Sequence, residues 1–341
     1  MESETESANA NKNETPSKNE VVSGNKNPSQ KEENKKEEKP QDTGKQESSE
    51  SIVVVNGDYE VIGDVLYVNS EKVTNEQITE VMNSGIKKVV VTSNVSHIKE
   101  SLFDSCHDFN NIIISEGVTS IGENAFNNCT HLEEITIPKT VKSIEKNAFS
   151  SCIYLRNVTI PNGVTTIKQD TFLGCFSLEK VVIPSSVTTI ERYAFSSCRS
   201  LKNISIPDSV TKIGDCAFDS CWELKEIKIP SGVKTIEDGM FVGCMNLTTV
   251  SIPNGVTSIG NNAFSHCDKL TSIVIPNTVT SIESNAFCFC KSLTSITIPN
   301  SVTSIAEDAF SYCDKLTTII GDAGSYAETY AKENGYTFVE T

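Results

Sequence analysis

The sequence predicts an α/β-type solenoid that is mostly β, with about ten 23-residue repeats and a cap at each end. Three observations carry this prediction. Ten of the 12 cysteines lie 23 residues apart, a phenylalanine stands three residues before each of them, and in eight repeats a proline keeps the same period. The cysteines of this series are Cys106, Cys129, Cys152, Cys175, Cys198, Cys221, Cys244, Cys267, Cys290 and Cys313.

Residues 1–50 are rich in Glu, Lys, Asn, Ser, Gln and Pro and contain no aromatic residue. Such a segment cannot bury enough apolar surface to offset the loss of chain entropy on folding. We therefore expect a disordered, low-complexity tether that holds the repeats away from a surface, with a merely solubilising tail as the alternative.

Residues 51–98 predict an N-terminal cap followed by a degenerate first repeat. Ile52–Val55 reads as a strand that runs into a hairpin turn at Asn56-Gly57. The segment 74–77 has the spacing of a capping box and opens a short helix that carries Ile78 and Val81 and ends at Gly85. A solenoid needs such caps because its last coils would otherwise expose the core.

Residues 99–320 hold the repeats, each of which reads C-x-x-L-x-x-I-x-I-P-x-x-V-x-x-I-x-x-x-A-F-x-x. Leu132, Ile135 and Ile137 alternate with polar residues as in a short strand, and Pro138 ends it because proline has no N–H for the ladder. The V-x-x-I segment predicts a second short strand, and the A-F pair a tight turn. Because stacked coils about 4.8 Å apart would bury these apolar residues, we expect a right-handed leucine-rich-repeat superhelix.

Residues 321–341 predict the C-terminal cap. Ser325 to Glu328 has capping-box spacing and opens a second helix, which Asn334-Gly335 ends. Tyr336–Val339 can then add a last strand. Both ends of the repeat array are thus predicted to be closed.

Charge and hydropathy exclude several classes of partner. The formal charge of −16 leaves the repeats strongly acidic, which argues against nucleic acid and anionic membranes, because both attract clustered Lys and Arg. No run of about 20 apolar residues is present, so no transmembrane segment is predicted. The chain as given also begins without the charged-then-apolar pattern of a secretion signal.

The residues that could carry chemistry do not form a recognisable site. Successive cysteines about 5 Å apart are too distant for a disulfide without pinching the stack, so free buried thiols are expected. The four histidines show no metal-ligand spacing, and no phosphate loop or nucleophile motif occurs. We therefore expect no catalytic residue, no cofactor and no metal, and no enzyme.

The position after each cysteine is the first candidate for a partner site. Along the chain it holds His107, Thr130, Ile153, Phe176, Arg199, Trp222, Met245, Asp268, Lys291 and Asp314. It is polar at both ends and apolar in the middle apart from Arg199, and Trp, Phe, Met and Arg are enriched in interface cores. We predict a binding edge at Ile153, Phe176, Arg199, Trp222 and Met245. The alternative is that this turn half-buries each side chain against the next coil.

The outward side chains of the first strand are the second candidate. They are charged in the early repeats and become Thr and Ser in the later ones. The predicted binding residues on this strand are Glu133, Arg156, Lys180 and Lys228. A recent duplication of the later repeats would explain the same gradient without a ligand.

The repeat resembles the BspA-like, or Treponema pallidum type, class of bacterial leucine-rich repeats. Clear instances are LTTVSIPNGVTSIGNNAF at 247–264 and LTSITIPNSVTSIAEDAF at 293–310, and GSYAETYAKENGYTF resembles the closing segment of such proteins. The resemblance covers about 86–341. It implies a surface-exposed or secreted adhesin whose partner is a host extracellular-matrix or cell-surface protein, and it carries over no catalytic residue.

One departure from the family leaves the location open. A secreted member would begin with a signal or a lipid-anchor motif, and the chain as given shows neither. Either a lipid anchor lies upstream of residue 1, which would make 1–50 the tether after the lipid, or the chain is cytoplasmic if it is complete as given. The leading hypothesis is a bacterial surface or secreted adhesin, and the alternative is an intracellular or spacer-type scaffold.

Overall fold

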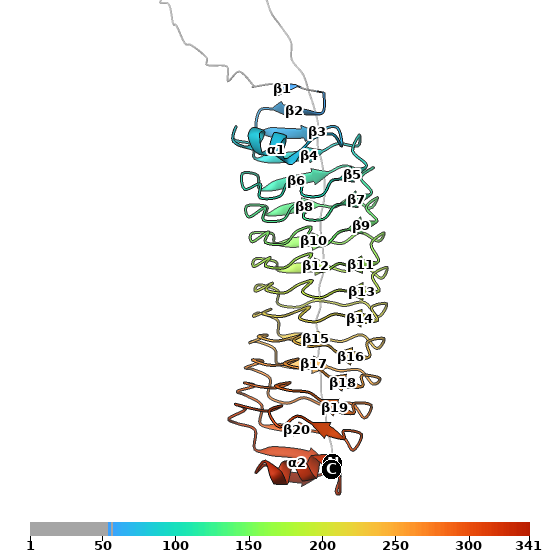
Figure 1. Cartoon of the computed structure of the whole chain (residues 1–341), viewed down its shortest axis with the longest axis vertical. Helices are drawn as coiled ribbons and strands as arrows, with labels where there is room; N and C mark the ends of the chain where they lie inside the picture. Colours follow the sequence, from blue (N-terminus) through green and yellow to red (C-terminus); the bar gives the residue numbers. More distant parts are fainter. Residues whose placement is uncertain (1–53, 56) are drawn as a thin grey trace, which may run out of the picture. The chain divides into compact units, whose positions relative to one another are not determined.

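The computed structural model describes residues 54–55 and 57–341. These residues form a solenoid of about twelve turns in which each coil lies on the preceding one (Figure 1). The solenoid with its 23-residue period is therefore confirmed, and the degenerate coils raise the number of turns above the ten that the cysteines mark. The predicted tether of 1–50 and the residues Ile52, Val53 and Asn56 lie outside the described residues.

The first coils form a mixed sheet with one helix. Its elements are β1 (Val54–Val55), β2 (Tyr59–Ile62), β3 (Val65–Val68), α1 (Asn75–Met82) and β4 (Lys88–Val91). Strands β1 to β3 are antiparallel, as the predicted hairpin requires, and β3 to β4 is the first parallel pair. Helix α1 crosses between them and buries Ile78, Val81 and Met82.

The predicted capping box of α1 is confirmed. The Thr74 hydroxyl accepts from the N–H of Gln77, and the Thr74 N–H donates to Gln77 Oε1 at 2.9 Å. The helix ends at Met82 rather than at Gly85, because the N–H of Gly85 already bonds to the carbonyl of Met82 in the turn that follows.

Each repeat contributes a first strand to one side of the solenoid, which we call the strand face (Figure 1). Its members after β4 are β6 (Asn111–Ile114), β8 (Glu134–Thr136), β10 (Asn157–Thr159), β12 (Lys180–Val182), β15 (Glu226–Lys228), β17 (Thr249–Ser251), β20 (Ser295–Thr297) and β22 (Thr318–Gly321). They pair in parallel with a 23-residue register, as in Ile112 opposite Ile135. The ladder is interrupted after β12 and again after β17, where the coils at 203–205 and 272–274 make only single bridges.

A second, shorter strand follows in each coil and confirms the V-x-x-I prediction. These strands are β5 (His97–Ile98), β7 (Ser120–Ile121), β9 (Ser143–Ile144), β11 (Thr166–Ile167), β13 (Thr189–Ile190), β14 (Lys212–Ile213), β16 (Thr235–Ile236), β18 (Ser258–Ile259), β19 (Ser281–Ile282) and β21 (Ser304–Ile305). They stack in parallel ladders beside the strand face (Figure 1). Each has two residues, of which the isoleucine is buried.

The core consists of columns of identical side chains. The ten phenylalanines that stand three residues before the cysteines, from Phe103 to Phe310, form the phenylalanine column. Their ring centroids are 5.1–5.7 Å apart and their planes are within 2–13° of parallel. All 12 cysteines are free, and the ten of the 23-residue series are buried. Free buried thiols are therefore confirmed.

The cysteine column also has a polar role that the sequence did not indicate. From Cys129 to Cys313, each thiol donates to the carbonyl of the phenylalanine 26 residues earlier, with Sγ–O distances of 3.0–3.4 Å. Each bond joins one coil to the preceding coil, at a carbonyl that also accepts from the N–H of the cysteine in its own coil, as the Phe126 carbonyl does from Cys129 at 3.2 Å.

The coils of Cys106 to Cys290 each turn sharply through two residues with positive φ, which lie five residues and one residue before the cysteine, and the coil of Cys313 has only the second of them. In most coils these positions hold Ser, Asn, Asp or Gly. The bulky exceptions are Tyr193, His266, Phe289 and Tyr312. A side chain with a Cβ costs roughly 1–2 kcal/mol in this conformation, and glycine occupies it freely. Aromatic residues at these positions therefore need a compensating contact.

The last coil is closed by α2 (Tyr326–Glu333) and β23 (Thr337–Glu340), which pairs in parallel with β22. Tyr330 covers the end of the phenylalanine column, 6.0 Å from the ring centroid of Phe310. The predicted capping box is wrong in one half. Ser325 accepts from the N–H of Glu328, but Glu328 Oε2 accepts from the N–H of Gly324, because the N–H of Ser325 donates to the carbonyl of Asp322 instead.

Within the described residues, neither α1 nor α2 is long and apolar enough to span a lipid bilayer.

Candidate functional site

The five residues predicted as a binding edge lie in one column on successive coils. The carbonyl of each of the first four accepts from a backbone N–H of the next coil; in one example Ser200 donates to Phe176 at 3.0 Å. Phe176, Trp222 and Met245 are 36%, 37% and 43% exposed, while Ile153 and Arg199 are half-buried. We call Ile153, Phe176, Arg199, Trp222 and Met245 the aromatic edge.

Arg199 is the centre of this edge and not an interruption of it. Its guanidinium carbon lies 4.2 Å from the ring centroid of Phe176 and 4.2 Å from that of Trp222. The coil spacing places one ring on each side of the planar guanidinium, and such cation–π contacts contribute roughly 0.5–2 kcal/mol each. Arg199 Nε is buried without a hydrogen-bond partner, so ring contacts hold the cation.

Polar pairs occupy the same column on either side of the aromatic edge. His107 Nδ1 lies 3.0 Å from the hydroxyl of Thr130, and Lys291 Nζ lies 2.8 Å from Asp268 Oδ2. Residues at this position thus contact their neighbours along the column, as the alternative interpretation predicts. The middle of the column nevertheless keeps apolar surface exposed, and its binding role stays a prediction.

A second set of outward aromatic residues was not predicted. His266, Phe289 and Tyr312 hold the position just before the cysteine in three successive coils. Their ring centroids are 4.5 Å and 4.4 Å apart, and the planes are within 10° of parallel. We call these three residues the C-terminal aromatic column. The signal in the sequence was the change from Ser, Asn and Gly to aromatic residues at one repeat position.

The four predicted residues of the strand face are exposed but do not converge. Arg156 Nη1 pairs with Glu179 Oε1 at 3.3 Å, and Lys228 Nζ lies 4.0 Å from Asp208 Oδ1 in the preceding coil. Glu133 and Lys180 lie on other coils of the same face. The structure therefore distributes these charges along the solenoid instead of assembling them with the aromatic edge.

A hollow of about 710 Å³ lies where the strand ladder is interrupted after β12. It is lined by the segment 203–208 and by residues of β15 and β17. Ile204 and Ile206 at this place are 8% and 9% exposed, whereas most core residues are fully buried. The hollow could not be foreseen, because Asn203 to Ile206 follows the ordinary polar–apolar alternation of the repeat.

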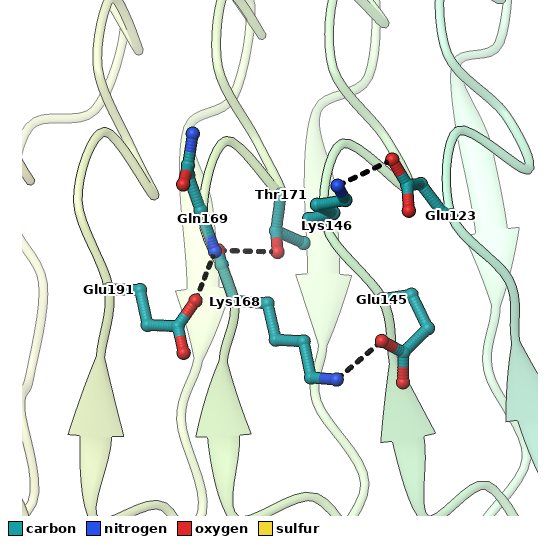
Figure 2. Close-up of polar contacts among 7 residues, drawn as sticks. All are labelled: Glu123, Glu145, Lys146, Lys168, Gln169, Thr171 and Glu191. Atoms are coloured by element: carbon teal, nitrogen blue, oxygen red, sulfur yellow. Dashed lines mark hydrogen bonds and ion pairs between the residues drawn. The ribbon is translucent and has the colours of Figure 1, made fainter.

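Beside the second strands, the coils are joined by a ladder of polar contacts. Figure 2 shows three of them: Lys146 with Glu123, Lys168 with Glu145, and the N–H of Gln169 with Glu191. Lys146 Nζ lies 2.9 Å from Glu123 Oε1, and the hydrogen bond to Glu123 raises the pKa of Lys146. Solvent-exposed pairs of this kind contribute little, with a median of about 0–1 kcal/mol. Their regular spacing indicates a structural role.

The deeply buried thiols of the cysteine column are poorly suited to nucleophilic or metal chemistry. Burial raises the pKa of Cys175 to about 12, and that of Cys106 to about 12. A thiol of this kind stays protonated near neutral pH, whereas the thiolate is the nucleophile and the metal ligand. Within 57–341, no three side chains of His, Cys, Asp or Glu are grouped so that they could hold a metal ion.

Comparison with known proteins gives a family and a set of structural neighbours. A sequence profile described as BspA type leucine rich repeat region (6 copies) matches residues 79–202 and 188–317. No curated protein matches the chain.

Two of the structural neighbours are a leucine rich cell surface protein from Faecalibacterium prausnitzii A2-165 and the leucine rich repeat protein of T. pallidum. The first is 28% identical, with 82% of this chain and 88% of that chain covered and a TM-score of 0.44. The second is 26% identical, with 64% and 86% covered and a TM-score of 0.40. Since the profile matches more than half of the sequence, the chain belongs to the family of BspA type leucine-rich repeat proteins.

Proposed function

We propose that the chain is a non-enzymatic protein-binding module and that it acts as an adhesin on a bacterial surface or after secretion. Solenoids of stacked repeats present extended surfaces that suit protein partners. The family supports a surface or secreted location, as the repeat resemblance implied. The proposed partner is a host extracellular-matrix or cell-surface protein.

The aromatic edge is the observation that carries this proposal. The side chains of Phe176, Trp222 and Met245 stay partly exposed in this column. Between the two rings, the guanidinium of Arg199 is already shielded from water on both faces. Five coils at about 4.8 Å give a strip roughly 19 Å long. Interfaces derive most of their binding energy from a few aromatic and Arg anchors of this kind.

The double substitution Phe176→Ser and Trp222→Ser tests the edge. We expect the full-length variant to lose at least about tenfold in affinity for those purified matrix proteins that the wild-type chain captures, because hot-spot truncations cost about 2 kcal/mol or more. The measurement is surface plasmon resonance against a panel of matrix proteins, with a thermal melt by circular dichroism.

A matched control changes the same repeat position outside the edge. His107→Ser with Lys291→Ser removes one polar contact from each of two coils and should retain capture. Because the two rings are each more than a third exposed, the test variant should melt only a few degrees lower. Unchanged capture, or a variant that no longer folds, would contradict a binding role for the edge.

The alternative is a spacer that displays or links other components. The stacked contacts favour it in one respect, since Arg199 covers one face of both aromatic rings and so serves the fold as well. A wild-type chain that captures no matrix or cell-surface protein, together with a large loss of melting temperature in the double variant, would favour the spacer.

The proposed location is tested on intact cells. Brief treatment of the bacterium with an external protease, followed by mass spectrometry of the supernatant, should release peptides from the repeats. A cytoplasmic protein detected in the same supernatant would show cell lysis and serves as the control. Repeat peptides that appear only after the cells are broken would contradict a surface location.

A further inference from the structure

The C-terminal aromatic column occupies a position that the fold does not reserve for aromatic residues. His266, Phe289 and Tyr312 have φ of 59°, 61° and 60°, a conformation that favours glycine. Other coils place Gly174 and Gly243 at the same repeat position. The solenoid therefore forms without rings at this position, and three consecutive rings point to a purpose other than coil geometry.

The column has one open end. His266 and Phe289 are half-buried, whereas Tyr312 is 64% exposed. Among the residues that the structure describes, Tyr312 stacks on Phe289 alone, at 4.4 Å and 9°. Its other face has no ring or cation against it within this part of the chain, so the stack can accept one more planar group.

The part of the chain that carries Tyr312 is acidic and favours a positively charged group. Residues 306–341 carry seven carboxylates against two lysines, and Asp314 is exposed two residues after the tyrosine. Such a field raises the local concentration of cationic partners. Negative charge attracts an ammonium group and a guanidinium alike.

The aromatic edge, whose repeat position is two residues from that of Tyr312, shows which cation fits between stacked coils. Arg199 lies 4.2 Å from each of two ring centroids, close to the 4.4 Å step of the C-terminal aromatic column. A guanidinium is planar and weakly hydrated and stacks on aromatic faces, whereas an ammonium is compact and strongly hydrated.

We propose that the open face of Tyr312 binds an arginine side chain from a basic segment of a partner protein. The inference rests on the proposed protein-binding function and adds a second contact to it. Since residue 176 lies in the fourth repeat and Tyr312 in the tenth, the two sites are six coils, roughly 29 Å, apart. A partner that used both would span most of the repeat array.

Two fluorescein-labelled peptides test the site, one with three arginines separated by Gly-Ser and the other with lysines in their place. Fluorescence anisotropy with the full-length chain in 50 mM NaCl should show about fivefold tighter binding of the arginine peptide, the factor expected from one cation–π contact. Tyr312→Gly should abolish this preference and leave binding of the lysine peptide unchanged. Tyr312→Phe should retain it, because the ring face remains.

The controls keep the result interpretable. Glycine fits the positive φ of this position, so Tyr312→Gly should melt within about 2 °C of the wild-type chain. Equal binding of both peptides, with no effect of Tyr312→Gly, would reduce the interaction to general charge attraction and overturn the proposal. Binding of an N-acetylglucosamine trimer that Tyr312→Gly removes would assign the face to a sugar and would also overturn it.

The outcome is separable from that of the proposed function. Capture of matrix proteins by the wild-type chain tests the function as a whole, and the arginine preference tests Tyr312. A wild-type chain that captures matrix proteins but binds both peptides equally refutes this site alone.

Discussion

Replacement of Phe195 by alanine is expected to destabilise the solenoid by about 3–5 kcal/mol, the usual cost of truncating a large core side chain. Phe195 is fully buried and stacks between Phe172 and Phe218 at 5.5 Å on both sides. The N–H of Phe195 bonds to the carbonyl of Ala217 at 2.9 Å, which fixes the distance to the next coil. The neighbouring rings therefore cannot close the cavity.

Phe195→Ala should also make the two halves of the solenoid unfold less cooperatively. In a solenoid each repeat contacts only its neighbours, so weakened contacts at one coil reduce the coupling between the two halves. We expect urea unfolding followed by circular dichroism to shift to a lower midpoint and to broaden. Hydrogen exchange should show the lowest protection around the coil of Phe195.

Phe289→Ala is the matched control. Phe289 is also a stacked phenylalanine, but it is half-buried at the surface, so its truncation loses the stacking contacts without leaving an enclosed cavity. We expect a cost of no more than about 1 kcal/mol. Equal effects of the two substitutions would show that the phenylalanine column is not a continuous core.

The fold could be predicted because the same apolar pattern recurs in every repeat. One strand of three residues gives a weak signal, but the same alternation at a 23-residue period fixes the register of every coil. The interruptions of the strand ladder at 203–205 and 272–274 could not be predicted. Hydrogen-bond geometry changes there while the apolar pattern stays the same.

The candidate site was predicted only in part. Exposure of Phe176 and Trp222 followed from their repeat position, but the role of Arg199 depends on the spacing between coils, which no single repeat contains. The C-terminal aromatic column was missed for a similar reason. The positive φ that makes Phe289 and Tyr312 exceptional is a property of the turn and not of the residue type.

The cysteine column is expected to make the fold unusually sensitive to alkaline pH. In the unfolded chain a thiol has its ordinary pKa, near 9.0, whereas burial raises the pKa of Cys175 to about 12. Burial raises the pKa of seven further thiols in the same column: Cys106, Cys129, Cys152, Cys198, Cys221, Cys244 and Cys267. For Cys290 the hydrogen bond with Cys313 contributes more than burial, and the pKa of Cys313 itself is lowered by that bond.

The direction follows from proton linkage. Above pH 9 the unfolded chain releases thiol protons that the folded chain keeps, so the unfolded state binds fewer protons and the free energy of unfolding falls as the pH rises. The stability is fully present below pH 9. Between its unfolded and its folded pKa, each buried thiol lowers the free energy of unfolding by about 1.4 kcal/mol per pH unit. Eight thiols, without the Cys290–Cys313 pair whose two shifts oppose each other, would remove on the order of 10 kcal/mol by pH 10, comparable to the whole stability of a domain.

Urea unfolding at pH 8, 9, 9.5 and 10 in the presence of a reducing agent measures this slope. A variant with Cys152→Ala, Cys175→Ala and Cys198→Ala lacks three adjacent thiols, and its alkaline slope should be smaller by about 4 kcal/mol per pH unit. The variant starts from lower stability at pH 8, because it also loses three thiol–carbonyl bonds. The difference in slope, not the stability at one pH, therefore decides the test. An identical slope in both proteins would assign the alkaline loss to lysine and tyrosine groups and would contradict a role for the cysteine column in it.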